Sequence, residues 1–219
     1  MIVVIDGLSG SGKSSTAKAV AKKLGIQYLD SGALYRTATF IWLHDGKRLT
    51  ENQFIDILES KDIEFEFKND RFLVFLNGRN ITSELRRQSV SDNVSMVAAM
   101  PGVRRFLNDL MRKAVSTDDY IADGRDLGSV VFPDAEFKFF MKASLDERAR
   151  RRYKELESNG ESVSLGEVEQ NLDKRDRKDL NRTVDPLIKP DDAVEIDTTR
   201  ISFDEQVDKI CSIIAKEIR

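Results

Sequence analysis

Residues 7–14 read GLSGSGKS and match in full the pattern G-x-x-x-x-G-K-[ST], which is typical of phosphate-binding loops. Gly7 and Gly12 let the backbone turn tightly, so that its N–H groups can point at phosphate oxygens. In such a loop the lysine, here Lys13, reaches the β- and γ-phosphates, and the hydroxyl of Ser14 can bind Mg²⁺. The stretch therefore predicts a binding site for a nucleoside triphosphate.

The residues on either side of this loop agree with that interpretation. Residues 2–5 form an apolar run typical of a buried strand. Apolar residues then recur at positions 17, 20, 21 and 24, the spacing of one helical face, and Gly25 stands where a helix commonly ends. A strand, a glycine loop and a helix in this order aim the helix N-terminus at a bound anion. A glycine-rich turn that binds nothing explains this context poorly.

Composition narrows the class of protein. The chain has 219 residues, of which 40% are hydrophobic, enough for an α/β domain with a real core. Its formal net charge of −3 gives no sign of a nucleic-acid or membrane partner, and no apolar run is long enough to span a bilayer. The single cysteine, Cys211, excludes an internal disulfide, and the single histidine, His44, argues against a Ser–His–Asp triad. We expect a buried Cys211, a surface His44 and a cytoplasmic protein without a signal peptide.

Strand and helix patterns alternate along most of the chain. We expect strands at about 2–5, 27–30, 120–123, 137–141 and 193–196, separated by helices. This order predicts an α/β fold with a central parallel five-stranded sheet flanked by helices. Ligands of such sheets bind beyond the carboxyl ends of the strands, which places residues 7–14, 30–36 and 123–126 along one edge.

One segment departs from the alternation of strands and helices. Residues 63–67 alternate with period 2, residues 72–76 do so in part, and turn residues occupy positions 69–70 and 77–78. We predict a small antiparallel insert at about 62–88.

Helix starts can be read from Ser/Thr residues followed three positions later by Glu or Gln. Thr50/Gln53, Ser144/Glu147, Ser164/Glu167 and Ser202/Glu205 predict four capping boxes. We also expect Ser91 to cap a helix that ends before Pro101.

Two further charged motifs follow predicted strand ends. Residues 30–36 read DSGALYR and would place Tyr35 and Arg36 on the first turns of a helix. Residues 123–126 read DGRD, so that Asp123 could hold Mg²⁺, directly or through water, and Arg125 could contact phosphate. Three charges directly after a buried strand are costly unless they are paired or used.

The fourth motif, residues 175–182, reads RDRKDLNR. Arg175, Asp179 and Arg182 have the spacing of one helical face, which would separate the two guanidinium groups by about 10 Å along the helix and suit two phosphates, or a phosphate and a sugar. We interpret Arg150, Arg151 and Lys154, earlier in the same charged region, as a solvated helix face.

Taken together, these four segments resemble the bacterial cytidylate kinases, which are ATP-dependent P-loop nucleoside monophosphate kinases acting on CMP and dCMP. The resemblance runs over nearly the whole chain and rests on the phosphate loop, DSGALYR at 30–36, IADGRDLGSVVFPDA at 121–135, RDRKDLNR at 175–182 and the antiparallel insert. Two residues depart from the family, Leu8 where members usually carry proline and Leu180 where some carry arginine. We expect neither to take part in chemistry.

The resemblance implies a role for each motif. The catalytic residues would be Lys13, Arg125, Arg182 and Asp123, and Mg²⁺ would be held at Ser14 and Asp123. The ATP-binding set would be Gly7, Ser9, Gly10, Ser11, Gly12, Lys13, Ser14, Ser15 and two arginines of the lid, Arg148 and Arg152. The CMP-binding set would be Ser31, Tyr35, Arg36, Ser95, Arg104, Arg125, Asp126, Arg175, Asp179 and Arg182. Without the resemblance, Ser95 and Arg104 would read as an ordinary helix serine and an exposed arginine.

The same resemblance implies a division of labour along one kinase domain, 1–219. The core would comprise 1–30, 104–145 and 183–219, the NMP-binding region 31–103, and a helical lid 146–182. We expect a monomer whose partners are ATP and CMP or dCMP. Another kinase of this fold, such as a uridylate, adenylate or shikimate kinase, and a non-catalytic P-loop switch are the alternatives. The insert and the 175–182 motif argue against the first, and the acceptor-site arginines against the second.

Overall fold

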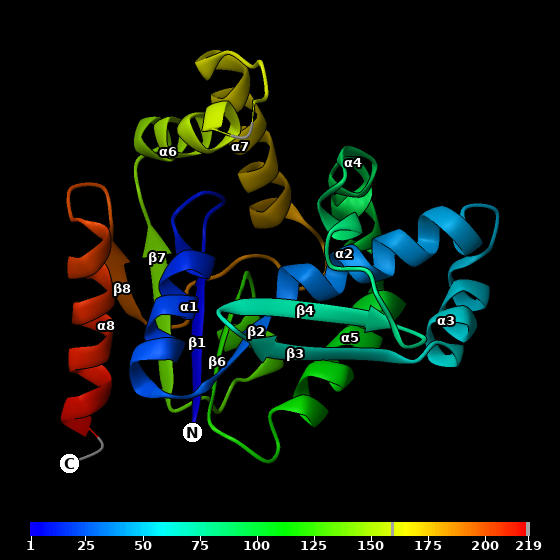
Figure 1. The fold of residues 1–219 in the computed structure, drawn as a ribbon, viewed down its shortest axis with the longest axis horizontal. Coiled ribbons are helices and arrows are strands. Elements are labelled where there is room, and N and C mark those ends of the chain that lie inside the picture. Colours follow the sequence, from blue (N-terminus) through cyan, green and yellow to red (C-terminus); the bar gives the residue numbers. More distant parts are fainter. Residues whose placement is uncertain (159, 218–219) are drawn as a thin grey trace. The chain divides into compact units, whose positions relative to one another are not determined.

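The computed structural model describes residues 1–158 and 160–217. Position 159, in the predicted lid, and positions 218–219, at the end of the predicted core, lie outside the described residues. The chain forms two compact units (Figure 1), one made of residues 1–26 and 121–219 and the other of residues 27–120.

A five-stranded parallel sheet in the order β2-β6-β1-β7-β8 confirms the predicted architecture. Its strands are β1 (Ile2–Gly7), β2 (Gln27–Asp30), β6 (Tyr120–Gly124), β7 (Phe137–Lys142) and β8 (Val194–Asp197). β1 pairs with β7 with Gly7 opposite Met141, and β7 pairs with β8. Residues 3–5 of β1 are completely buried, as expected for a continuous apolar run in the central strand of a parallel sheet.

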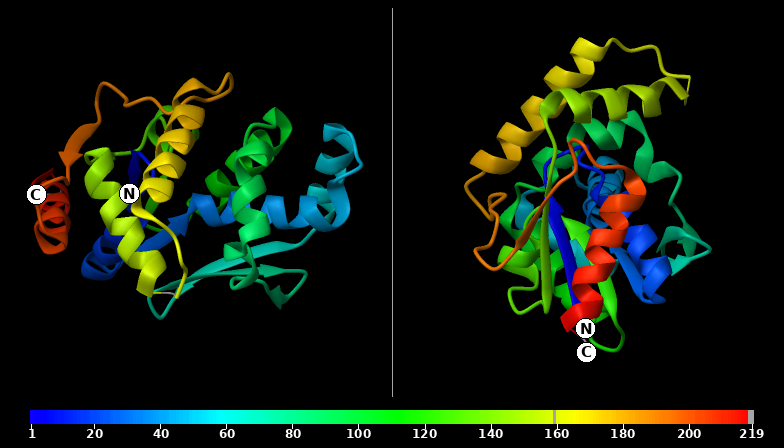
Figure 2. Two further views of the ribbon diagram at one scale, coloured as in Figure 1. Left: turned by 90° about the horizontal axis from the view of Figure 1, so that it is seen from above. Right: turned by 90° about the vertical axis from the view of Figure 1, so that its left-hand side faces the viewer.

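Two helices flank the sheet within the first unit. α1 (Lys13–Leu24) begins directly after the glycine loop and ends at Gly25, which has the left-handed φ of 69° expected for a helix C-terminus. α8 (Phe203–Glu217) packs beside α1 (Figure 2), and its buried stripe includes Cys211, as predicted.

A helical hairpin occupies most of the predicted lid. α6 (Leu145–Ser158) and α7 (Leu165–Asn181) lie side by side in Figures 1 and 2. The hairpin has a small apolar core of its own, made of Ala149, Leu156, Val168 and Leu172. This core makes the hairpin a coherent structural piece.

The second unit carries most of the remaining helices. They are α2 (Ser31–Ile41), a π-helical turn (Trp42–Gly46), α3 (Glu51–Ser60), α4 (Gln88–Val97) and α5 (Pro101–Ala114). His44 is exposed, as expected. None of the helices formed by the described residues is long and apolar enough to cross a lipid bilayer.

The antiparallel insert is confirmed as a three-stranded meander. β3 (Ile63–Lys68), β4 (Arg71–Leu76) and β5 (Arg79–Asn80) pair in sequence order. Asn69 and Asp70 make the first turn with φ values of 52° and 60°, a conformation that Asn and Asp tolerate better than most residues.

Two predicted helix starts are wrong in detail. Ser91 does not cap α4, because the helix begins at Gln88, and the Ser91 hydroxyl instead accepts a hydrogen bond from Arg36. Ser144 receives the N–H of Glu147, but its own N–H donates to Thr199, and the Glu147 side chain binds Arg151, so only half of that box forms. The other three boxes form in both directions.

Candidate active site

The glycine loop links the carboxyl end of β1 to the first turn of α1. Gly7, Gly10 and Gly12 have φ values of 145°, 74° and 91°, which lie outside the range that other residues readily adopt. Ser11 closes the turn, its N–H and hydroxyl both donating to the carbonyl oxygen of Leu8. The loop conformation is therefore built from the two glycines that the pattern requires, Gly7 and Gly12, and from Gly10 at a position that the pattern leaves open.

Lys13 lies inside this loop and is 5% exposed. Its Nζ donates to the carbonyl oxygen of Leu8 at 2.7 Å. Burial, followed by the positive charge of Arg125, lowers the pKa of Lys13 well below its ordinary value. The carboxylates of Asp123, Asp6 and Asp179 offset this effect only in part, so a polyanionic ligand would stabilise the ammonium further.

Ser14 and Asp123 come from different segments and meet at the carboxyl edge of the sheet. The Ser14 Oγ donates to the Asp123 Oδ2 at 2.7 Å, and Ser15 stands next to it on the exposed side of α1. This contact confirms that the residues 7–14 and 123–126 lie together. Hydroxyl and carboxylate oxygens are ligands that Mg²⁺ accepts.

Asp6, the last acidic residue before the loop, was not predicted as a site residue. It is 1% exposed, and its carboxylate accepts the N–H groups of Leu127 at 3.0 Å and Gly128 at 2.7 Å. Burial raises the pKa of Asp6 to about 6, although the two backbone hydrogen bonds act in the opposite direction. Asp6 thus holds the turn that follows Asp126 against β1. A lone carboxylate within an apolar strand was the available sequence signal.

The raised pKa of Asp6 has a measurable consequence. The native protein keeps this proton to about pH 6 and the unfolded chain releases it near 3.8, so the native state binds more protons between these values. The contribution of Asp6 to the free energy of unfolding therefore falls by about 3 kcal/mol as the pH rises from 3.8 to about 6. We expect a carboxyl ¹³C NMR signal, absent in Asp6→Asn, to titrate near pH 6. A midpoint near 3.8 would contradict the assigned cause.

Arg125 connects the loop to the 175–182 motif. Its Nε donates to the Asp179 Oδ2 at 2.8 Å, and its Nη2 donates to the Ser9 Oγ at 3.0 Å. Both partners are predicted site residues, so the structure brings Arg125, Asp179 and Ser9 together. The guanidinium is held beside the phosphate loop by these two side chains and by the carbonyl oxygen of Gly124, to which its Nη1 donates at 3.2 Å.

Arg182 pairs with Asp126, its Nη2 lying 2.8 Å from the Asp126 Oδ1, and its Nε donates to the carbonyl oxygen of Asp185. The predicted common helical face is wrong for this residue. α7 ends at Asn181, and Arg182 has an extended backbone with ψ of 144°, so only Arg175 and Asp179 belong to the helix. The chain turns out of the helix and brings Arg182 to the strand-end motif instead.

The two predicted lid arginines differ in their surroundings. Arg148 is 4% exposed and forms an ion pair with the buried Asp176, whereas Arg152 is half-buried and pairs with Glu155. The interpretation of Arg151 as a solvated side chain is wrong in part. Besides its pair with Glu147, it donates to the carbonyl and hydroxyl oxygens of Thr198.

In the second unit, α2 and α4 carry several of the predicted acceptor-site residues. Ser31 is the first residue of α2, where the side chain of Asp30 caps the helix by accepting the N–H of Ala33. Arg36 donates from Nη1 to the Ser91 Oγ at 3.1 Å. Ser95 lies on α4, one helical turn beyond Ser91, and is half-buried.

Arg104 on α5 is 1% exposed, so its side chain is deeply buried in the second unit. Its guanidinium carbon lies 5.3 Å from the centre of the Tyr35 ring, a cation–π geometry, and Nη1 donates to the carbonyl oxygen of Ala98 at 3.2 Å. The expectation from helix patterns alone, an exposed arginine, is therefore wrong. The Tyr35 ring and the Ala98 carbonyl offset part of the cost of burying this charge.

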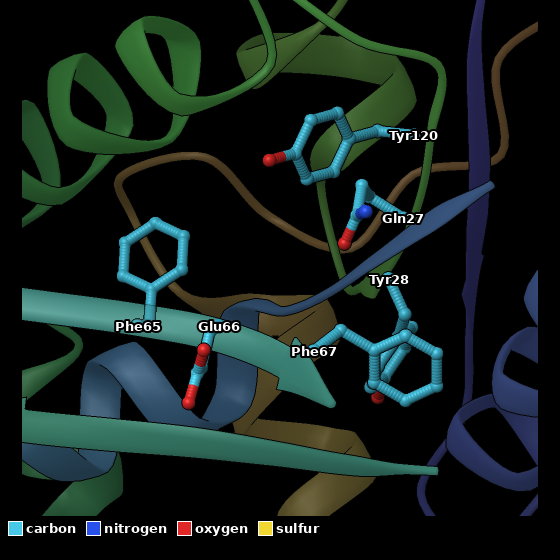
Figure 3. A pocket seen from close by; sticks show the side chains of 6 residues that line it. All are labelled: Gln27, Tyr28, Phe65, Glu66, Phe67 and Tyr120. Atoms are coloured by element: carbon cyan, nitrogen blue, oxygen red, sulfur yellow. The ribbon is translucent and has the colours of Figure 1, made fainter. Parts of the chain in front are cut away.

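A cavity of about 270 Å³ lies elsewhere in the second unit (Figure 3). Figure 3 shows Phe65 and Glu66 on opposite sides of β3, as alternation along a strand requires. Tyr28 packs edge-on against Phe67 with ring centres 5.3 Å apart. The lining contains no predicted site residue and consists of Gln27, Tyr28, Phe65, Glu66, Phe67 and Tyr120. We assign this hollow to the packing of the insert.

Sequence comparison identifies a single family. The family model described as cytidylate kinase matches residues 3–216. The chain is 42% identical to the cytidylate kinase of Carboxydothermus hydrogenoformans over 99% of this chain and 98% of that protein. It is 43% identical to the cytidylate kinase of Clostridioides difficile over 98% of both chains.

Comparison with solved structures bears on the fold alone. An uncharacterized protein from Eubacterium ventriosum superposes with a TM-score of 0.54, covering 98% of both chains at 13% identity. Likeness at this identity agrees with the architecture described above and carries no information about the substrate.

Proposed function

The chain belongs to the cytidylate kinase family, and from that premise we propose how its residues transfer the γ-phosphoryl group of ATP to CMP or dCMP, giving ADP and CDP or dCDP. It is an ATP-dependent nucleoside monophosphate kinase. The observation that carries the mechanism is the hydrogen bond between Ser14 and Asp123, since it joins the donor loop to the strand-end motif. The acceptor-site arginine Arg125 follows Asp123 by two residues.

The donor half of the site would be the phosphate loop. Backbone N–H groups of the glycine loop, among them those of Gly10 and Gly12, would bind the ATP phosphates, and Lys13 would neutralise charge that builds up during transfer. Ser14 and Asp123 would hold Mg²⁺, which in such sites is bound through one or two protein oxygens together with substrate phosphates. When bound, this ion neutralises charge on the β- and γ-phosphates.

The acceptor half would be arginine-rich. Arg36, Arg125 and Arg182, with Ser31 and Tyr35, would hold the phosphate of CMP, and Arg175 and Asp179 would contact the sugar. Guanidinium groups suit this task because their planar fork matches two phosphate oxygens. A phosphate monoester is already anionic at neutral pH, so the reaction needs no general base. Positioning and charge stabilisation would supply the rate acceleration.

Recognition of cytosine would rest on Ser95, Arg104 and Asp126. Cytosine offers an amino donor and a ring-nitrogen acceptor, whereas uracil reverses both. Asp126 would accept from the amino group, and Arg104 would donate to the ring. A buried site built for one pattern leaves polar groups unpaired with the other base, and this discriminates strongly.

A coupled ADP-release assay with ATP and each of CMP, dCMP, UMP and AMP tests this assignment. We expect CMP and dCMP to exceed UMP and AMP in kcat/KM by about 10²-fold or more, the scale set by unpaired polar groups in a selective site. Equal values for CMP and UMP would refute the cytosine site while leaving a kinase. ADP release that does not depend on any acceptor would instead indicate a nucleotide switch.

We further propose that residues 146–182 act as a lid, that residues 31–103 bind the acceptor around the insert at 62–88, and that 1–30, 104–145 and 183–219 form the core. Lid closure would exclude water, because water competes with CMP for the phosphoryl group. We expect the protein to act as a monomer. We also expect it in the cytoplasm, a reducing compartment in which a free thiol such as that of Cys211 is usual.

A further inference from the structure

Helix α6 and the segment after β8 hold the phosphate loop from outside through two carbonyl oxygens. The Nη1 of Arg148 donates to the carbonyl oxygen of Ser9 at 2.9 Å. The Oγ1 of Thr198 donates to the carbonyl oxygen of Ser11 at 3.2 Å. The two tethered carbonyls are two residues apart in the loop that would bind ATP.

We call the contact of Arg148 with the Ser9 carbonyl the first tether and that of Thr198 with the Ser11 carbonyl the second. The first tether is part of a network of buried charged groups. Arg148 also donates from Nε to the carbonyl oxygen of Ala143 at 3.0 Å and pairs through Nη1 with the Asp176 Oδ2. The other oxygen of Asp176 accepts the N–H of Ser9 at 2.9 Å. Ser9 is thus held through its N–H by α7 and through its carbonyl by α6.

The second tether is oriented by Arg151. Its guanidinium donates to the Thr198 Oγ1 at 3.1 Å. Because arginine can only donate, the hydroxyl proton of Thr198 points toward an acceptor, and the carbonyls of Ser11 and Lys142 both lie 3.2 Å away. Thr198 is completely buried, so no solvent competes for that proton.

Peptide geometry converts these carbonyl contacts into amide orientation. The carbonyl of Ser9 shares a rigid plane with the N–H of Gly10, and the carbonyl of Ser11 shares one with the N–H of Gly12. In a trans peptide the two groups point in opposite directions, and no cis peptide bond occurs among the described residues. Because both carbonyls point toward Arg148 and Thr198, the N–H groups of Gly10 and Gly12 point away from these two residues, toward the opposite side of the loop.

We propose that Arg148 and Thr198, supported by Asp176 and Arg151, are positioning residues that orient the phosphate-binding amides of Gly10 and Gly12. This inference rests on the proposed function, in which those amides bind the phosphates of ATP. It gives Arg148 a task different from contact with the transferring γ-phosphate. It also ties the hairpin of α6 and α7 to the loop, so that movement of the hairpin and the shape of the phosphate site are linked.

ADP affinity separates positioning from direct contact, because ADP lacks the γ-phosphate. The variants are Thr198→Val, which removes the hydroxyl and keeps the shape, and Arg148→Lys, which keeps the charge and loses the fork. Arg150→Gln is the matched control, since Arg150 lies on the same helix, is 59% exposed and pairs only at the surface with Asp146. Calorimetry would measure the Kd of ADP, and kinetics would measure KM for ATP and for CMP.

We expect both variants to raise the Kd of ADP and the KM for ATP about tenfold, because each weakens one hydrogen bond to a charged group. The KM for CMP should stay within about twofold of the wild-type value. The proposal would be overturned if both variants bound ADP as tightly as Arg150→Gln does. If kcat of Arg148→Lys then fell while its ADP affinity did not change, Arg148 would be assigned to contact with the γ-phosphate. Near-UV circular dichroism checks the fold, and if Arg148→Lys is unfolded, Thr198→Val decides. Absence of CMP phosphorylation by the wild type would refute the proposed function, while the ADP titration would still test the tether.

Discussion

Replacing Lys13 by methionine is expected to lower kcat by about 10²–10³-fold, the loss seen when one preorganised charge or donor is removed from a transition state. The lysine is 5% exposed and already placed within the loop by its bond to the carbonyl of Leu8, so little reorganisation precedes its use. A coupled ADP-release assay at saturating ATP and CMP measures the effect.

The same substitution should not weaken the fold. Burial and the nearby Arg125 lower the pKa of Lys13, which means that its charge costs stability in the native state. Below the lowered pKa that cost is present in full, and it disappears as the pH rises toward 10.5, the ordinary value for lysine. Urea unfolding at pH 7 should therefore show Lys13→Met at least as stable as the wild type.

Lys23→Met is the matched control for this experiment. Lys23 lies in the last turn of the same helix, at the end opposite to the loop; it is 55% exposed and pairs with Asp208 at 2.6 Å. Its loss should leave kcat within about twofold and the urea midpoint of unfolding nearly unchanged, because exposed ion pairs contribute little to stability. Near-normal turnover of Lys13→Met beside an unaffected Lys23→Met would remove the lysine from the proposed mechanism.

Local sequence patterns predicted the parts of the molecule that depend on near neighbours. The glycine loop, the meander and three capping boxes each arise from interactions within a few residues, and the structure contains them where they were expected. The parallel sheet also followed, because alternating strands and helices leave few alternatives. The alternation of strands and helices does not, however, predict where a helix ends.

The errors occur where a distant residue competes with a local pattern. Arg182 has the spacing of the helical face of Arg175 and Asp179, yet it leaves the helix and pairs with Asp126, which is 56 positions away. The Glu147 side chain binds Arg151 and does not accept the N–H of Ser144, so only half of the predicted capping box forms. Asp176 stood inside a recognised motif without an assigned role, because its partners, Arg148 and Ser9, become visible only in three dimensions. Contacts of this kind carry no signal in a single sequence.

Gly7→Ala is expected to abolish stable folding, the largest effect on stability that the structure predicts. Gly7 ends β1 with a φ of 145°, and a Cβ added there would lie 1.9 Å from the carbonyl oxygen of Met141. That oxygen belongs to β7, the strand paired with β1, so it cannot move without separating two central strands. We expect a loss of about 4 kcal/mol or more, a range reserved for severe steric conflict or loss of a core feature.

Two other glycines separate the steric clash from the backbone strain. Gly25 also has a positive φ, 69°, but nothing lies within 4 Å of an added Cβ, so Gly25→Ala should cost only about 1 kcal/mol. Gly166, on α7, has open space and an ordinary helical backbone, so Gly166→Ala should stabilise the protein by up to about 1 kcal/mol. Soluble yield and urea unfolding would rank the three variants. If Gly7→Ala unfolded at the same urea concentration as Gly25→Ala, the contact with Met141 would not be the constraint that fixes glycine at the start of the phosphate loop.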